Sequence, residues 1–153
     1  MPDDRFQGIG DILAYAIRRE IDAAEGYGRM AGLARTPGLR ELLLEIKGEE
    51  ENHRRLLEGL SAAGLGSAVP TSVPDMGLSD ALDDVPLEPD MTLQDLLIFA
   101  ARKEKAAAEL YAALGRGPGL EAHRHIFEFL AGQERAHKLK LETEYEKRVL
   151  TED

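Results

Sequence analysis

The sequence contains no cysteine and no tryptophan, and aromatic residues make up only 5% of its 153 residues. Without cysteine the chain can form no disulfide, thiolate metal site or four-cysteine iron centre, so any metal ion would have to bind to Glu, Asp and His. Runs of Val, Ile and Thr that would predict strands are also missing. Ala, Leu, Glu, Lys and Arg recur instead, which is typical of a helical protein, and the length favours one domain over residues 1–153.

The sequence also lacks the roughly 20 consecutive apolar residues of a membrane span, and its start, MPDDR, lacks the features of a secretory signal. We therefore expect a soluble, cytoplasmic protein with no membrane partner. The net charge is -10, and residues 56–101 hold eight acidic residues and no Lys or Arg. This local excess favours a solvated connection over a cation-gathering surface, and no basic face indicates a nucleic-acid partner.

Apolar residues recur at helical spacing in four stretches, at about 9–34, 38–63, 92–115 and 119–149. A short joint at 36–38 separates the first two stretches, and a joint at 115–119 separates the last two. Both joints contain Gly and Pro, the expected residues where one helix ends and the next begins. Each pair of helices is therefore predicted to form an antiparallel hairpin.

The long stretch between the hairpins, about 64–91, carries four prolines, so no long helix can run through it. It leaves room for a short helical turn near residues 78–83. Thr92 and Asp95 have the spacing of a capping box for the third helix. The sequence thus predicts an all-α fold, an antiparallel four-helix bundle whose hairpins are joined by a long crossover.

The two hairpins are related by an internal repeat. When the chain is shifted by 84 residues, residues 11–27 align with residues 95–111, and nine of these seventeen positions are identical. The register holds beyond the turn, where Gly48, Glu50 and His53 align with Gly132, Glu134 and His137. A duplicated helical hairpin accounts for this pattern.

Each hairpin carries one Glu on its first helix and a Glu-x-x-His on its second, and these residues occupy the predicted core stripe. The six residues are Glu20, Glu50, His53, Glu104, Glu134 and His137. Residues three apart share a helix face, and the lone Glu precedes the paired Glu by 30 residues in both halves, which brings them to nearly the same height. Four buried carboxylates must be protonated or neutralised by cations, and four Glu charges balance two divalent ions. The two ions of such a dinuclear site could bind both atoms of an oxidant.

This donor set, one Glu from each of two helices and Glu-x-x-His from each of the other two, is that of the ferritin-like carboxylate proteins. Over both hairpins the chain resembles the rubrerythrin-like branch of that superfamily. The resemblance implies two iron ions, each with one His ligand, His53 or His137. It also implies that Glu20 and Glu104 are terminal ligands and that Glu50 and Glu134 bridge the ions. The residue types themselves would also accept manganese or zinc.

The resemblance further implies that Tyr27 and Tyr111 hydrogen-bond to ligand carboxylates and so orient them. Aromatic filling of the core is the alternative interpretation of both tyrosines. Rubrerythrins add an iron–sulfur domain with paired cysteines, which this sequence lacks, so any electron donor would be a separate protein. They also carry an additional Glu where this chain has Ala107. These departures make the ligand set more similar to that of bacterioferritin and the stand-alone erythrins.

The resemblance implies a di-iron oxidoreductase that oxidises its ferrous ions with hydrogen peroxide or oxygen, acts in oxidative-stress defence and forms a homodimer. No catalytic residue beyond the metal ligands is indicated. One alternative is a ferroxidase for iron storage or handling, because each hairpin also resembles the two-helix encapsulated ferritins. Another alternative is a non-catalytic, metal-stabilised helical interaction module, which would show redox-silent metal binding and an exposed apolar patch.

Several residues near the predicted ligands are expected to lie outside the site. Surface positions are predicted for Glu25, Glu109, His123 and His125. In the run 49–51 only Glu50 is predicted to point inward. Gly48 and Gly132, two residues before the paired Glu, are expected to permit close helix packing or a local distortion.

Overall fold

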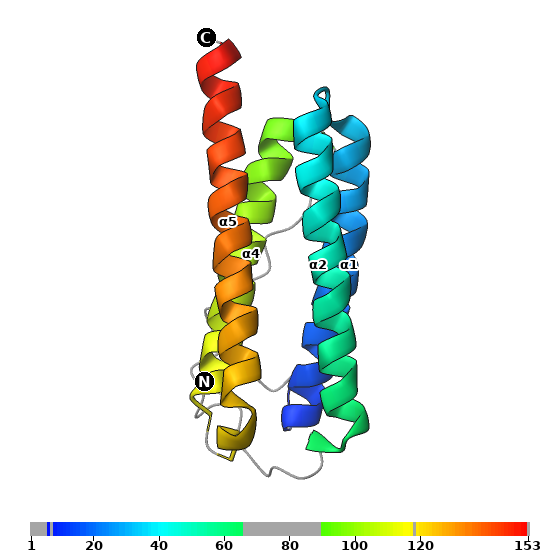
Figure 1. Cartoon of the computed structure of the whole chain (residues 1–153), viewed down its shortest axis with the longest axis vertical. Coiled ribbons are helices and arrows are strands. Elements are labelled where there is room, and N and C mark those ends of the chain that lie inside the picture. Colours follow the sequence, from blue (N-terminus) through cyan, green and yellow to red (C-terminus); the bar gives the residue numbers. More distant parts are fainter. Residues whose placement is uncertain (1–5, 7, 66–89, 118, 153) are drawn as a thin grey trace.

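The computed structural model describes residues 6, 8–65, 90–117 and 119–152. Its helices are α1 (Ile9–Leu33), α2 (Pro37–Ala62), α4 (Leu93–Gly115) and α5 (Arg124–Glu152), and a short 3-10 turn, η2 (Glu121–His123), precedes α5. Figure 1 shows α1 and α2 as one antiparallel hairpin beside a second hairpin made of α4 and α5. The described residues contain no strand, so the predicted all-α four-helix bundle is confirmed. Most of the expected crossover and its helical turn near 78–83 lie outside the described residues.

The starts of two helices are fixed by side-chain caps. In α2, Thr36 Oγ1 accepts a hydrogen bond from the Leu39 backbone N–H at 3.3 Å, and Pro37 occupies the first turn. In α4, Thr92 and Asp95 form the predicted capping box. Thr92 Oγ1 accepts from the Asp95 N–H at 3.1 Å, and the Asp95 carboxylate accepts from the Thr92 N–H at 3.0 Å.

The start of the fourth helix differs from the prediction, which placed it near residue 119. Gly119 has a φ of 81°, a left-handed conformation that cannot begin an α-helix. The chain then passes through Leu120, which is fully buried, and the 3-10 turn before α5 begins at Arg124.

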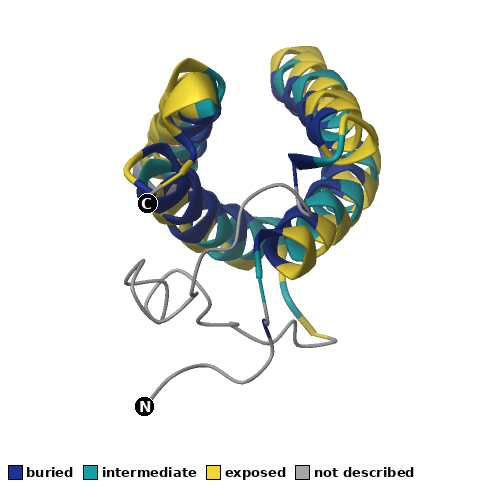
Figure 2. Cartoon of the chain, turned by 90° about the horizontal axis from the view of Figure 1, so that it is seen from below, coloured by how far each residue is buried: buried dark blue, intermediate teal, exposed yellow. Residues whose placement is uncertain are grey.

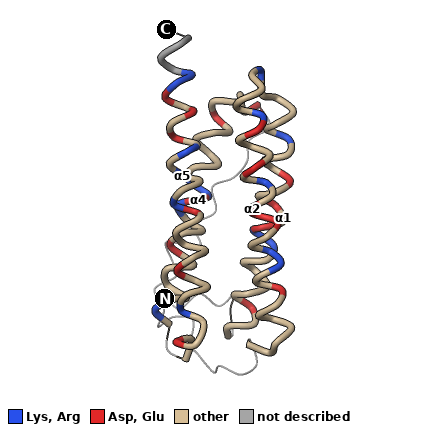
Figure 3. Tube along the Cα trace, in the orientation of Figure 1, with Lys and Arg blue, Asp and Glu red and all other residues tan. Residues whose placement is uncertain are grey.

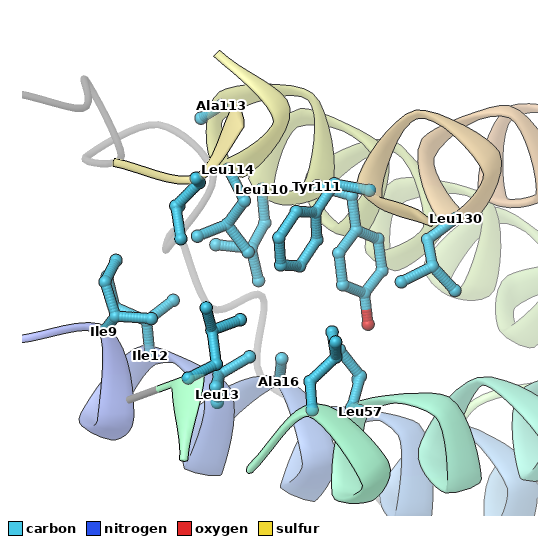
Figure 4. Packing of buried hydrophobic residues seen from close by; sticks show 14 of the residues in the cluster. Ile9, Ile12, Leu13, Ala16, Leu57, Leu110, Tyr111, Ala113, Leu114 and Leu130 are labelled. Atoms are coloured by element: carbon cyan, nitrogen blue, oxygen red, sulfur yellow. The ribbon is translucent and has the colours of Figure 1, made fainter. Parts of the chain in front are cut away.

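The apolar core consists of two clusters. The Phe127 cluster includes Ile9, Leu13, Leu57, Leu114, Phe127 and Leu130, and the Leu43 cluster includes Met30, Leu39, Leu43, Ile46, Leu97 and Leu141. Figure 4 shows part of the Phe127 cluster, with side chains of α1 and α2 facing those of α4 and α5. Figure 2 shows that buried residues line the inner sides of both hairpins. In every helix a short segment separates the residues of one cluster from those of the other, and these segments carry the polar residues discussed below.

Both signs of charge are spread over the bundle. Figure 3 shows acidic and basic residues on all four helices. Within the part of the chain that the structure describes, we find no helix with the length and apolarity needed to cross a bilayer.

Candidate metal centre

Six charged or polar residues are buried between the Phe127 and Leu43 clusters. They are Glu20, Glu50, His53, Glu104, Glu134 and His137, none of which exposes more than 2% of its surface. They are the buried polar or charged side chains found among the described residues, and they are the six residues that the sequence places on the core stripe. Burying this many ionisable groups together is costly unless they are paired, protonated or bound to cations.

The six side chains form two overlapping groups of possible metal ligands. One group is Glu20, Glu50, His53 and Glu134, and the other is Glu50, Glu104, Glu134 and His137. Within each group the donor atoms lie within 4.8 Å of one another. Glu50 and Glu134 belong to both groups, whereas each histidine and each remaining Glu belongs to one. Two cation positions that share two carboxylates fit this arrangement.

The donor atoms that face one another have no hydrogen-bond partners. Glu20 Oε2, Glu50 Oε1, His53 Nδ1, Glu104 Oε2, Glu134 Oε1 and His137 Nδ1 are all buried and unsatisfied. His53 Nδ1 lies 2.9 Å from Glu134 Oε1 and 3.2 Å from Glu50 Oε1, yet no hydrogen bond of good geometry forms. Buried polar atoms are rarely left without a partner, and here every one of the six residues contributes such an atom. The donor set therefore fits a pair of bound metal ions.

Three carboxylates of the centre, Glu20, Glu50 and Glu134, have strongly divided pKa values. Burial, together with the charge of Glu50, raises the pKa of Glu20 to about 7. Burial and the neighbouring Glu104 carboxylate raise the pKa of Glu134 well above its usual value. For Glu50 burial acts in the same direction, but His137 and His53 outweigh it and hold its pKa well below the usual range.

The two imidazoles hold their protons more tightly than an isolated histidine does. Burial alone would lower the pKa of His53, but the adjacent Glu20 and Glu50 carboxylates outweigh it and raise the pKa to about 10. For His137, Glu104 and Glu50 outweigh burial in the same way and raise the pKa to about 11. In the metal-free chain, protons on the imidazoles thus occupy the place that cations would take.

Two buried tyrosines connect the hairpins at the centre. Tyr27 on α1 donates a hydrogen bond from its hydroxyl to Glu104 Oε1 at 2.5 Å, and Tyr111 on α4 donates one to Glu20 Oε1 at 2.5 Å. Burial and the neighbouring carboxylate raise the pKa of each tyrosine well above 10, so both hydroxyls remain donors. Each tyrosine therefore uses one oxygen of a Glu and leaves the other oxygen to face the centre.

The outward nitrogens of both histidines also have partners. His53 Nε2 lies 3.0 Å from Gln133 Oε1, and His137 Nε2 lies 2.8 Å from Glu49 Oε2. The two imidazole rings stack, with centroids 5.9 Å apart and an interplanar angle of 19°. An acceptor at Nε2 keeps the proton there and leaves Nδ1 available as a metal ligand.

A pocket of about 570 Å³ lies between α2 and α5 on one side of the centre. We call it the α2/α5 groove, and it is lined by Glu49, Asn52, His53, Arg55, Leu56, Phe129 and Gln133. Phe129 is 52% exposed, and its ring meets the His53 ring edge to face at 6.4 Å. The groove thus opens from solvent onto His53 and onto Glu49, the partner of His137.

The predictions for residues near the candidate ligands are only partly confirmed. Glu25, Glu109 and His125 are exposed, and His123 is half-buried, but none of them belongs to either ligand group. Close packing at Gly48 and Gly132 was a wrong expectation, because a Cβ atom added at either would meet nothing within 4 Å.

Sequence reasoning missed Glu49 and Gln133. In the run 49–51 only Glu50 is buried, as predicted, but Glu49 still reaches His137 across the bundle. Their positions in the sequence could have indicated this role. Glu49 and Gln133 each directly precede a Glu of the centre, and the shift of 84 residues relates them to each other.

No family model and no curated protein matches this sequence. Two solved structures are similar to it. A hypothetical protein from Pyrococcus furiosus is 26% identical with a TM-score of 0.71, over 90% of this chain and 88% of that chain. A "putative ferritin-like diiron-carboxylate protein" from Thermotoga maritima is 22% identical with a TM-score of 0.79, over 95% of this chain and 99% of that chain. This likeness shows that the chain shares the helical-bundle fold of both proteins.

Proposed function

We propose that this protein is a di-iron oxidoreductase of the rubrerythrin-like type, which oxidises a diferrous centre with hydrogen peroxide or oxygen. The observation that carries the proposal is the set of six buried, unsatisfied donor atoms arranged in two groups that share Glu50 and Glu134. The Thermotoga maritima protein with the same fold supports it, because its name describes a diiron-carboxylate protein.

In this proposal Glu20 and His53 would hold one ion, Glu104 and His137 would hold the other, and Glu50 and Glu134 would contribute to both positions. A diferrous pair would supply the two electrons that, with two protons, reduce one hydrogen peroxide molecule to two water molecules. A separate electron-donor protein would return those electrons. Manganese or zinc would fit the same oxygen and nitrogen donors, so the metal itself must be measured.

The chain's own residues would orient the ligands and control access. The Tyr27 hydroxyl fixes Glu104 and the Tyr111 hydroxyl fixes Glu20, so the terminal carboxylates keep one oxygen directed at the centre. The apolar clusters on both sides would exclude water along the bundle axis, and a small oxidant would approach from the side of His53, which lines the α2/α5 groove. A homodimer and a role in oxidative-stress defence are further parts of this proposal.

The proposal is tested by loading the protein with ferrous iron without air, measuring iron per chain, and recording the absorption before and after adding peroxide or air. We expect close to two irons per chain and a new near-ultraviolet band of the oxidised pair. Glu50→Gln removes a carboxylate common to both positions, so it should abolish this result. Glu25→Gln, an exposed Glu on α1, is the matched control and should change nothing.

The outcomes separate the proposal from its alternatives. Fewer than one iron per chain, or loading that survives Glu50→Gln, contradicts the di-iron proposal. Continued uptake far beyond two irons per chain would indicate ferroxidation for iron storage. Tight binding of zinc without any redox change would instead favour a metal-stabilised interaction module.

A further inference from the structure

The two halves of the centre match residue for residue except at one pair of positions. Under the shift of 84 residues, Glu20, Tyr27, Glu50 and His53 align with the identical residues Glu104, Tyr111, Glu134 and His137. The residues that contact the outward nitrogens of the histidines also align, but one is Glu49 and the other is Gln133.

The contacts made by this unequal pair cross between the hairpins. Glu49 on α2 accepts from His137 on α5, and Gln133 on α5 accepts from His53 on α2. The Glu49 contact is the shorter, 2.8 Å against 3.0 Å, and it joins a charged acceptor to an imidazole. A hydrogen bond to an ionised acceptor is roughly twice as strong as one to a neutral acceptor.

The acceptor at Nε2 affects how well Nδ1 binds a cation. A carboxylate partner makes an imidazole a better ligand and also adds a negative charge near the ion, whereas an amide only orients the ring. Side chains behind metal-bound histidines typically change metal affinity about 10-fold to 100-fold. Glu49 is 28% exposed on the α2/α5 groove, so solvent screens part of its charge, and the lower end of that range applies.

We infer that Glu49 and Gln133 are positioning residues that make the two metal positions unequal, so that the position of His137 binds a divalent cation about tenfold more tightly and fills first. This inference rests on the proposed function, because it requires two bound cations. It assigns to the centre an order of loading that a symmetric ligand set would not have.

The test isolates each position in the full-length metal-free protein. His53→Ala leaves the group around His137 complete, and His137→Ala leaves the group around His53 complete. We would measure the affinity of each variant for the first Co²⁺ by competition with a chelator, at one pH and one ionic strength. The His53→Ala protein should bind the first Co²⁺ about tenfold more tightly than the His137→Ala protein does. Repeating both measurements in the Glu49→Gln/Gln133→Glu background should reverse the order, because that exchange is isosteric and keeps the total charge.

A second measurement avoids the histidine variants in case one fails to fold. With all six ligands present, Glu49→Gln should weaken the first Co²⁺ binding constant, and Gln133→Glu should strengthen the second. Both changes should bring the two constants closer together. A purely structural role for these side chains would alter thermal stability without moving the two constants in opposite directions.

The failure of this inference differs from the failure of the proposed function. Two bound Co²⁺ ions whose order is unaffected by the exchange at positions 49 and 133 would overturn the inference alone. Absence of Co²⁺ binding to the unaltered protein would overturn both.

Discussion

Raising the pH should destabilise the metal-free protein because its folded form holds protons that its unfolded form releases. The pKa of His53 is raised to about 10 and that of His137 to about 11, whereas an unfolded histidine has a value near 6.5. Between pH 7.5 and 9 the folded chain therefore binds up to two protons more than the unfolded chain. The free energy of unfolding must fall as the pH rises through this window.

The size of this effect follows from the number of protons. Each histidine contributes about 1.4 kcal/mol per pH unit, so the two together give at most about 2.7 kcal/mol per unit. Glu134, whose pKa is also raised, acts in the same direction. For a chain of this length about 1 kcal/mol corresponds to roughly 2–4 °C, so the melting temperature should fall by about 5–10 °C per pH unit.

The assay is thermal unfolding of the metal-free protein, followed by circular dichroism at several pH values between 7.5 and 9 and constant ionic strength. The double variant His53→Gln/His137→Gln should lose most of the slope, while His125→Gln, which changes an exposed histidine, should retain it. A melting temperature that stays constant or rises over this window would refute the assignment of the bound protons to the centre.

Three further perturbations have expected outcomes of their own. Tyr111→Phe removes the hydrogen bond to Glu20, which belongs to the group of His53, and should weaken the second Co²⁺ binding constant by about tenfold without loss of helicity, as measured by chelator competition and circular dichroism. Gly48→Ala and Gly132→Ala each place a methyl group in open space on a helix. Each should raise the free energy of unfolding, measured with denaturant, by about 0.5–1 kcal/mol. A destabilised variant would contradict this. Leu57→Ala creates a cavity in the Phe127 cluster and should lower the free energy of unfolding by about 2–5 kcal/mol in the same assay. A decrease below about 1 kcal/mol would contradict the packing described.

Much of the fold could be predicted because its determinants are local in the sequence. The helical spacing of apolar residues placed three helices within about one residue of their observed bounds. The Thr92 and Asp95 pair marked the start of α4 through hydrogen bonds that depend only on a spacing of three residues. The start of α5 was missed because it depends on the left-handed conformation of Gly119, and the sequence could not distinguish a short 3-10 turn from a first α-helical turn.

The centre was predictable for a different reason, namely that its polar residues interrupt an apolar stripe twice in the same register. That pattern predicted that the six side chains are buried and close together, and the structure shows both. It carried no information about distances between helices. The contact of Glu49 with His137 depends on how closely α2 approaches α5, so a residue beside the core stripe could not be distinguished from an exposed one.

The four side-chain hydrogen bonds at the centre all join one hairpin to the other. They run from Tyr27 to Glu104, Tyr111 to Glu20, His53 to Gln133 and His137 to Glu49. The two carboxylates common to both ligand groups likewise come from different hairpins, Glu50 from α2 and Glu134 from α5. A cation bound to both of them would therefore link the hairpins at the level where the apolar core is interrupted. Because such an ion binds the folded form, saturation at 100 times its dissociation constant would add about 2.7 kcal/mol to stability, which is comparable to the loss expected over one unit of pH in the metal-free chain. If the proposed ions bind, metal occupancy rather than additional apolar packing would thus stabilise the middle layer of this bundle.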